Sequence, residues 1–389
     1  MVEWAQLVYS KDTQVNISSE FSIIKKYLSG IGTSYFKNNG INLAVGDDCA
    51  VIAANSKLLI STDTSVAGVH FLKSMPAESI AYRSVATALS DIAAMGGNPI
   101  AFNLSLVMPK FNQDWMKAFR KGLQKISKEF QFPLIGGDLA KGPLQISVTV
   151  LGKPEKKILL RSNAQPGDIL CLSGVIGLGY IGFQEYKKTG SLNNKTKPYL
   201  FPPAQINYGR LISSLASSAI DVSDGILQDL SHLISSSGVG CNLDLDQVPV
   251  VSQQYAKQCL EFGDDYQLLY TVPPKKLLAL QDNLNSYNKK CHTIGVMGGK
   301  KLVLSNNNFG SIKNWDHFQL NEISEFKKTF SYFSHMVWFR LIDSCTRNLG
   351  EFRRNNYLVL CRVFAFINSY HFTNFYLIFL AGLFSSSSR

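Results

Sequence analysis

The stretch from Ala44 to Phe71 reads AVGDDCAVIAANSKLLISTDTSVAGVHF and carries two acidic segments. These are Gly46-Asp47-Asp48 and Ser61-Thr62-Asp63-Thr64, and both are expected to be turns. The apolar residues Leu58–Ile60 lie between them and are expected to form a strand that ends at the second segment. Carboxylates that end a buried strand are costly unless a cation compensates their charge. The stretch therefore predicts a cation site at the end of this strand.

Further aspartates follow along the chain, each beside glycine, serine or small apolar residues and almost none close to a lysine or arginine. They are Asp91, Asp138, Asp221, Asp224, Asp264 and Asp265. Magnesium prefers oxygen ligands, and several loops together can supply a set of them. The spread of carboxylates predicts a site for several Mg²⁺ ions that folding assembles from distant segments.

The bulk composition is that of a globular protein. The chain has 389 residues, enough for two domains, with 46% hydrophobic and 17% charged residues. A formal charge of +11 suits nucleic acid, acidic lipid or a phosphorylated small molecule, although a lysine-rich solvated surface is the simpler explanation. The first 300 residues lack long basic runs with interleaved aromatics, so we expect no nucleic-acid partner.

The cysteines and the amino terminus both favour a cytoplasmic protein. Seven cysteines are scattered without a Cys-x-x-Cys pair or a zinc spacing, which indicates reduced thiols. Residues 1–6, MVEWAQ, lack the basic and apolar regions of a signal peptide.

Strands and helices alternate in both halves, which predicts an α/β (α+β) fold. Helices are expected from about Glu20 to Gly30 and over 76–95 and 112–130, and a strand over 132–135 should lead into a turn at Gly136-Gly137-Asp138. We divide the chain into a polar leader (1–19), an amino-terminal metal- and nucleotide-binding domain (20–152), a carboxy-terminal α/β domain (153–320) and an extension (321–389).

The glycine-rich segment Ser173–Gly179 follows an expected strand at Ile169–Leu172. It resembles a phosphate cradle, although its glycines would equally serve close helix packing.

The extension differs in composition from the rest. After Lys328 there are six arginines and no lysine, and Val363–Phe384 carries no formal charge. These 22 residues could span a bilayer, but polar side chains such as Asn368 and Asn374 make them a poor span. We interpret the segment as an extension of separate origin in preference to a membrane anchor.

Several ordered blocks resemble the thiamine-monophosphate kinases, members of the aminoimidazole-ribonucleotide-synthetase-like superfamily, over about 20–318. The blocks are Glu20-Phe21-Ser22-Ile23-Ile24, Gly46-Asp47-Asp48, Ser61-Thr62-Asp63-Thr64, Gly68-Val69-His70-Phe71, Leu89-Ser90-Asp91-Ile92-Ala93-Ala94-Met95-Gly96, Gly136-Gly137-Asp138, Ala219-Ile220-Asp221-Val222-Ser223-Asp224-Gly225, Gly263-Asp264-Asp265-Tyr266 and Trp315-Asp316-His317-Phe318. Each block alone is weak, and their common order is specific.

The resemblance implies ATP-dependent phosphorylation of thiamine monophosphate to thiamine diphosphate by a cytoplasmic homodimer with a two-domain fold. It implies catalytic roles for Asp63, Asp91 and Asp221, and it implies metal ligands at Asp48, Ser61, Thr62, Asp63, Asp91, Asp138, Asp221 and Asp224. ATP contacts are implied at Gly137, Asp138, Arg161 and Ser223, and substrate contacts at His70, Asp264 and Trp315.

One departure concerns substrate binding. The family usually has glutamate where this chain has Asp264, one methylene shorter, which puts that contact in question. Asp47 and Asp265 are equally well explained as turn residues. Two alternatives stay open: a superfamily relative that uses ATP on another acceptor, and a non-catalytic protein that binds anions or, through its tail, a membrane.

Overall fold

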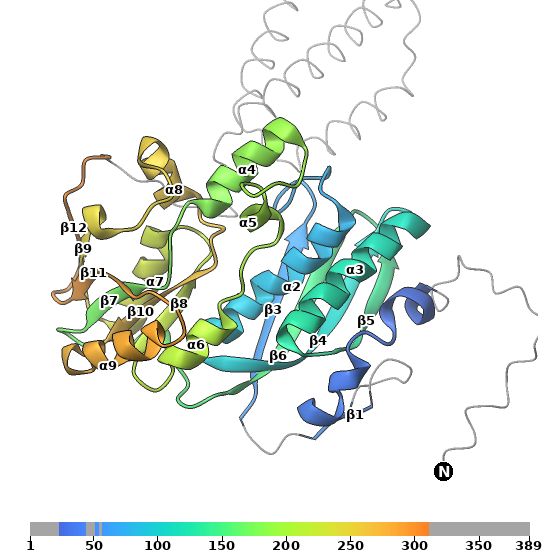
Figure 1. Ribbon diagram of the computed structural model, residues 1–389, viewed down its shortest axis with the longest axis horizontal. Helices are drawn as coiled ribbons and strands as arrows, with labels where there is room; N and C mark the ends of the chain where they lie inside the picture. Colours follow the sequence, from blue (N-terminus) through green and yellow to red (C-terminus); the bar gives the residue numbers. More distant parts are fainter. Residues whose placement is uncertain (1–22, 44–50, 54–56, 311–389) are drawn as a thin grey trace, which may run out of the picture. The chain divides into compact units, whose positions relative to one another are not determined.

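The computed structural model describes residues 23–43, 51–53 and 57–310, which form two large β-sheets and one two-stranded sheet, with helices packed against the large ones (Figure 1). This agrees with the predicted α/β class. Asp48, Trp315 and the whole extension lie outside the described residues. Among the helices that the structure does describe, none is both long and apolar enough to cross a membrane.

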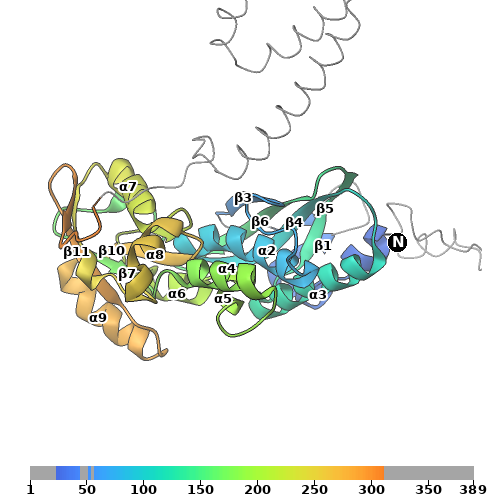
Figure 2. The ribbon, with the colours of Figure 1, turned by 90° about the horizontal axis from the view of Figure 1, so that it is seen from above.

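The first sheet is four-stranded, and two long helices cover one of its faces (Figure 2). Its order is β3 (Leu59–Val66), β6 (Gln145–Pro154), β4 (Gly97–Met108) and β5 (Leu134–Lys141), with only β4 and β5 parallel. The covering helices are α2 (Ala77–Ala94) and α3 (Gln113–Phe130), close to the predicted 76–95 and 112–130. Phe102, Leu104 and Leu106 alternate along β4 and are buried in the core below these helices.

The second sheet is six-stranded and mostly antiparallel. Its order is β12 (Leu302–Ser305), β9 (Cys241–Asp244), β11 (His292–Met297), β7 (Ile169–Leu172), β10 (Gln267–Val272) and β8 (Ser218–Val222). The accompanying helices are α4 (Leu178–Thr189), α5 (Lys197–Leu200), α6 (Ile206–Ile212), α7 (Ile226–Ser237), α8 (Ala256–Phe262) and α9 (Pro274–Asn285). Strands of the first sheet end at Pro154 and those of the second begin at Ile169. The domain limit at 152 remains a prediction, and the limit at 320 lies outside the described residues.

Short elements connect and flank the sheets. They are the π-helical η2 (Ile24–Leu28), the 3-10 turns η3 (Thr33–Tyr35), η4 (Lys37–Asn39), η5 (Arg161–Asn163), η6 (Leu245–Gln247) and η7 (Gln253–Tyr255), and the two-stranded pair β1 (Ile41–Leu43) and β2 (Val51–Ile52). The helix expected from Glu20 is, in its described part, η2, after which Ser29 is extended.

Local sequence explains where the two covering helices begin and end. The Asn112 side chain accepts a hydrogen bond from the Trp115 amide at 2.9 Å and so caps α3, which ends where Gln131 adopts φ 55°. Met116, Phe119 and Leu123 recur at helical spacing and are buried. Helix α2 starts after Pro76 and is buried along nearly its whole length.

The structure corrects two sequence-based expectations. Ser61–Thr64 was expected to be a turn but lies inside β3, and Gly136–Asp138 lies inside β5. The reason is that both segments pair with neighbouring strands, which satisfies their backbone amide and carbonyl groups. Their side chains therefore alternate between the two faces of the sheet, and they do not all converge at a strand end.

Candidate functional site

The carboxylates of β3 and α2 meet on the covered face of the first sheet. Ser61 and Asp63 lie two residues apart on β3, so both point toward α2. The Ser61 hydroxyl donates a hydrogen bond to Asp91 Oδ2 on that helix. Burial raises the pKa of Asp91 above its ordinary value; the Ser61 hydrogen bond opposes this shift and the nearby charge of Asp63 adds to it.

Asp221, from the second sheet, belongs to the same group of carboxylates. It lies in β8 and is 6% exposed. Burial, reinforced by the charge of Asp91, raises the pKa of Asp221 to about 7. The charge of Asp63 therefore disfavours ionisation of Asp91, and the charge of Asp91 disfavours ionisation of Asp221, although the three residues are far apart in sequence.

Asp229 belongs to this group, and the sequence reasoning missed it. Asp229 Oδ2 accepts hydrogen bonds from the Ser223 and Asp224 amides at 3.0 and 3.1 Å, so it fixes the loop that follows Asp221. Burial first, then the charges of Asp221 and Asp224, raise the pKa of Asp229 to about 8. Its position in the first turn of α7, just after Asp224-Gly225, was the available signal.

Arg161, at the start of η5, supplies positive charge to the group. It counteracts the rise in the pKa of both Asp91 and Asp221. One guanidinium beside Asp91 and Asp221 does not balance these two carboxylates and Asp63 together. The remaining negative charge suits a divalent cation. Nevertheless, no three His, Cys, Asp or Glu side chains in the described ranges enclose a ready-made metal site.

Two further residues assigned as metal ligands lie on the other face of the sheet. The cross-strand row Thr64, Ser147, Ser105 and Asp138 follows the row Asp63, Val148, Leu104 and Gly137. Asp138 therefore lies on the face opposite Asp63, as does Thr62, whose hydroxyl bonds to that of Thr149 at 2.9 Å. Their metal-binding role remains a prediction.

Gly137 has a backbone reason to be glycine. A Cβ atom built there would lie 1.8 Å from the Leu104 carbonyl oxygen of the neighbouring strand. This close approach accounts for the residue without any ligand, so its assigned ATP contact remains a prediction.

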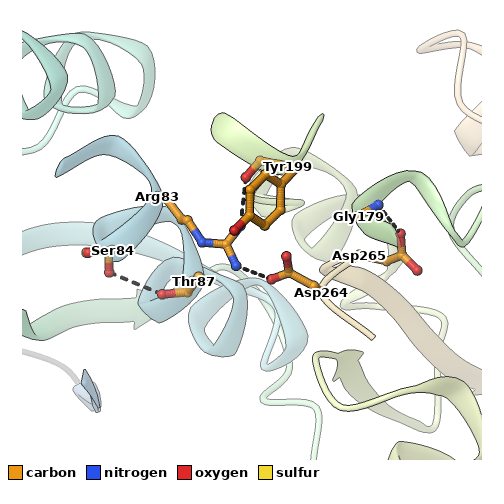
Figure 3. Close-up of polar contacts among 7 residues, drawn as sticks. All are labelled: Arg83, Ser84, Thr87, Gly179, Tyr199, Asp264 and Asp265. Atoms are coloured by element: carbon orange, nitrogen blue, oxygen red, sulfur yellow. Dashed lines mark hydrogen bonds and ion pairs between the residues drawn. The ribbon is translucent and has the colours of Figure 1, made fainter. Parts of the chain in front are cut away.

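The predicted substrate contacts are only partly described. His70 Nδ1 accepts a hydrogen bond from the Val66 amide at 3.0 Å, so part of its bonding capacity holds its own turn. Asp264 forms an ion pair with Arg83 of α2 (Figure 3). Trp315 lies outside the described residues.

The glycine-rich segment before α4 is occupied by a carboxylate from the chain itself. Asp265 Oδ2 accepts a hydrogen bond from the Gly177 amide at 2.7 Å. Asp265 Oδ1 accepts one from the Gly179 amide at 3.0 Å (Figure 3). The amides that could cradle a phosphate are therefore bonded to Asp265, which caps α4 in the manner of a bound anion. We therefore assign a structural role, and not ligand binding, to Asp265 and to the glycine-rich segment Ser173–Gly179.

Asp265 should make folding stability depend on pH. Burial, opposed by the Gly177 and Gly179 amides, raises the pKa of Asp265 to about 7 from 3.8. At intermediate pH the native state keeps a proton that the unfolded chain has released, so this carboxyl contributes less stability as pH rises from about 4 to 7. We expect the free energy of unfolding of the wild type, minus that of Asp265→Asn, to fall over this range by up to about 4 kcal/mol.

Denaturant titrations at several pH values measure this difference, because other titrating groups cancel in it. The exposed Asp114→Asn is the control and should show no such slope. Parallel pH curves for wild type and Asp265→Asn would contradict the assignment.

Comparison with protein families gives matches to both halves of the chain. Residues 46–153 match the N-terminal domain of AIR synthase related proteins, and residues 165–305 match their C-terminal domain. A thiamine-monophosphate kinase of Buchnera aphidicola (subsp. Schizaphis graminum) is 36% identical over 296 residues, covering 72% of this chain and 91% of the relative. That of Haemophilus influenzae is 33% identical, covering 72% and 90%.

Solved structures agree with these matches. A thiamine-monophosphate kinase from Stenotrophomonas maltophilia K279a superposes with a TM-score of 0.66 at 30% identity, covering 74% of this chain and 97% of that one. AaThiL, solved in complex with AMPPCP and TMP, gives a TM-score of 0.61 at 26% identity, covering 79% and 100%. The hydrogenase maturation protein HypE, at 15% identity with a TM-score of 0.60, shares the fold.

Proposed function

Because the chain belongs to the thiamine-monophosphate kinase family, we propose that it transfers the γ-phosphoryl group of ATP to thiamine monophosphate, giving thiamine diphosphate and ADP. The single observation that carries the proposal is the convergence of Asp63, Asp91 and Asp221 from two sheets into one carboxylate group. AaThiL, the relative solved with AMPPCP and TMP, binds a nucleotide analogue and TMP together.

The reaction needs charge compensation more than a strong base. The second pKa of a phosphate monoester is about 6, so the acceptor is already largely anionic at neutral pH. Two unit charges at about 4 Å repel by about 4 kcal/mol at an effective dielectric constant of 20. Mg²⁺ held by Asp63, Asp91 and Asp221 would supply the positive charge that offsets this repulsion. A site rich in carboxylates and poor in histidine fits these requirements.

We assign the residues of the covered face to metal binding. Asp63, Asp91 and Asp221 hold Mg²⁺, and Ser61 orients Asp91 through the hydrogen bond that it donates. Asp224 lies on the loop fixed by Asp229 and holds a further ion. Ser223 and Arg161 contact the ATP phosphates, and Arg161 already acts electrostatically on Asp91 and Asp221.

The face of the first sheet opposite α2 and α3, where β1 and β2 leave it uncovered, supports a homodimer. It carries the hydroxyls of Thr62, Thr64, Ser147 and Thr149, paired at 2.8–2.9 Å, and the side chain of Ile60, which is 63% exposed. An exposed isoleucine among paired hydroxyls suits contact with a second copy. Such a dimer would place Asp138 beside the partner subunit. Asp138 could then bind metal in a site at the subunit interface. We place the dimer in the cytoplasm.

A coupled ADP-release assay tests the function. Thiamine monophosphate, thiamine and an aminoimidazole precursor are offered in parallel with ATP. We expect ADP release only with thiamine monophosphate, together with thiamine diphosphate as the product. Turnover with the aminoimidazole precursor alone would instead assign the chain to another branch of the superfamily.

Removing divalent cations should abolish this activity reversibly. The carboxylates and the two phosphate groups are all negatively charged. Once Mg²⁺ is chelated, nothing offsets their mutual repulsion. We expect no ADP release in excess EDTA and full recovery on adding Mg²⁺. Activity that persists in EDTA would contradict the assignment of Asp63, Asp91 and Asp221 to metal binding.

A further inference from the structure

Arg83 is a buried cation of α2 whose partners all come from the second half of the described chain. Its side chain is 5% exposed and forms an ion pair with Asp264, whose side chain is 13% exposed. Arg83 Nη1 donates to the Tyr199 carbonyl oxygen at 2.7 Å, and the guanidinium lies 4.8 Å from the Tyr199 ring centroid (Figure 3). Burial opposes its charge, but the Asp264 carboxylate outweighs this and raises the pKa of Arg83.

The loop that carries Asp264 is itself bonded to the site. The Asp264 amide donates to the Ser223 carbonyl oxygen at 2.8 Å, and the Tyr266 amide donates to the Val222 carbonyl oxygen at 2.9 Å. A Cβ atom on Gly263 would lie 2.3 Å from the Ser223 carbonyl oxygen, so the two loops are in close contact. A continuous path therefore leads from Arg83 through Asp264 to the segment Asp221–Asp224.

The backbone of this loop needs to be held. Asp264 and Tyr266 adopt φ of 62° and 51°, a region that non-glycine residues rarely occupy. Such conformations persist when surrounding contacts enforce them. The side chains of Asp264 and Asp265 diverge, one to Arg83 and the other to the amide of Gly179 (Figure 3). The loop is thus fixed on one side by α2 and on the other by α4.

We propose that Arg83 is a positioning residue for phosphoryl transfer, and that Asp264 serves the reaction through Arg83 and not by touching the substrate. Arg83 and Asp91 lie eight residues apart on α2, roughly 12 Å along its axis. The ion pair fixes α2 relative to the loop after β8, and so sets Asp91 opposite Asp221. This inference rests on the proposed kinase function.

The same pair explains the shorter acid at position 264. A guanidinium has a planar fork that can bond Tyr199 and Asp264 at once, which an ammonium cannot reproduce with the same reach. Lysine at 83 would leave a gap that the longer glutamate at 264 could fill. The pair is therefore expected to tolerate a joint exchange better than either single one.

The experiment compares Arg83→Lys, Asp264→Asn, Asp264→Glu and the double variants R83K/D264N and R83K/D264E, with the exposed Lys117→Ala as control. We expect kcat to fall by about 100-fold in Arg83→Lys and in Asp264→Asn, as for a misplaced site, with the KM for thiamine monophosphate changed less than about twofold. R83K/D264N should be no worse than either single variant, and R83K/D264E should recover much of the loss.

A raised KM for thiamine monophosphate in Asp264→Asn, with Arg83→Lys unaffected, would overturn the proposal in favour of direct substrate contact. Thermal unfolding without substrates provides a second test, because Tm shifts that simply add in R83K/D264N would also overturn it. If a single variant does not fold, the kcat of R83K/D264E is compared with that of the wild type instead. Failure of the wild type to release ADP would instead contradict the proposed function. The thermal midpoints of the wild type, the single variants and R83K/D264N would still show whether Arg83 and Asp264 are coupled.

Discussion

Asp63→Asn should retain the fold and lose turnover by about 100- to 1,000-fold, the cost of removing one preorganised electrostatic group. Asp63 lies on β3 beside Ser61 and acts electrostatically on Asp91. The asparagine keeps the size of the side chain but removes the negative charge that, in the proposed mechanism, would hold Mg²⁺. The measurement is kcat at saturating ATP and thiamine monophosphate over a series of Mg²⁺ concentrations.

The exposed Asp114→Asn is the control, because the Asp114 side chain is 90% exposed and pairs with Lys117 on the surface of α3. It should leave kcat within about twofold, since exposed ion pairs contribute little. Without Mg²⁺, the thermal midpoint of Asp63→Asn should be equal to or higher than that of the wild type, because one fewer carboxylate relieves repulsion in the group. Near-normal turnover of Asp63→Asn would remove this residue from the metal site.

Gly209→Ala should destabilise the protein by about 3 kcal/mol, near the upper end for overpacking a core. A Cβ atom at 209 on α6 would lie 2.0 Å from the Ala93 carbonyl oxygen and 3.1 Å from the Ala93 Cα of α2. Backbone cannot rotate away as a side chain can, so α6 and α2 must separate. Because alanine is otherwise the better helix former, the measured loss is a lower bound on the cost of the clash. Urea unfolding gives the free energy.

Gly298→Ala is the matched control, since a Cβ atom there meets nothing within 4 Å. It should leave the free energy of unfolding nearly unchanged. Ala93 is two residues from Asp91, so Gly209→Ala should also lower kcat, whereas Gly298→Ala should not. Equal stability of the two alanine variants would show that α6 and α2 can separate without cost.

Sequence patterns located most elements closely where periodicity was strong. The expected helices at 76–95 and 112–130 are α2 and α3, and the strand Ile169–Leu172 is β7 with the same limits. The prediction of turns at the acidic segments 61–64 and 136–138 is wrong, because both lie in strands. Polar residues in a strand give the same local sequence signal as a loop. Only pairing with β6 and β4 distinguishes the two.

The sequence by itself determined the fold class, the family and the kind of chemistry, because ordered motifs and carboxylate-rich segments are local properties of the chain. Tertiary structure decided which carboxylates meet. It brought Asp63, Asp91 and Asp221 together, added Asp229, placed Asp138 on the other face of the sheet, and bonded Asp264 to Arg83. Strand register and helix packing set these distances, and neither is written in any single segment.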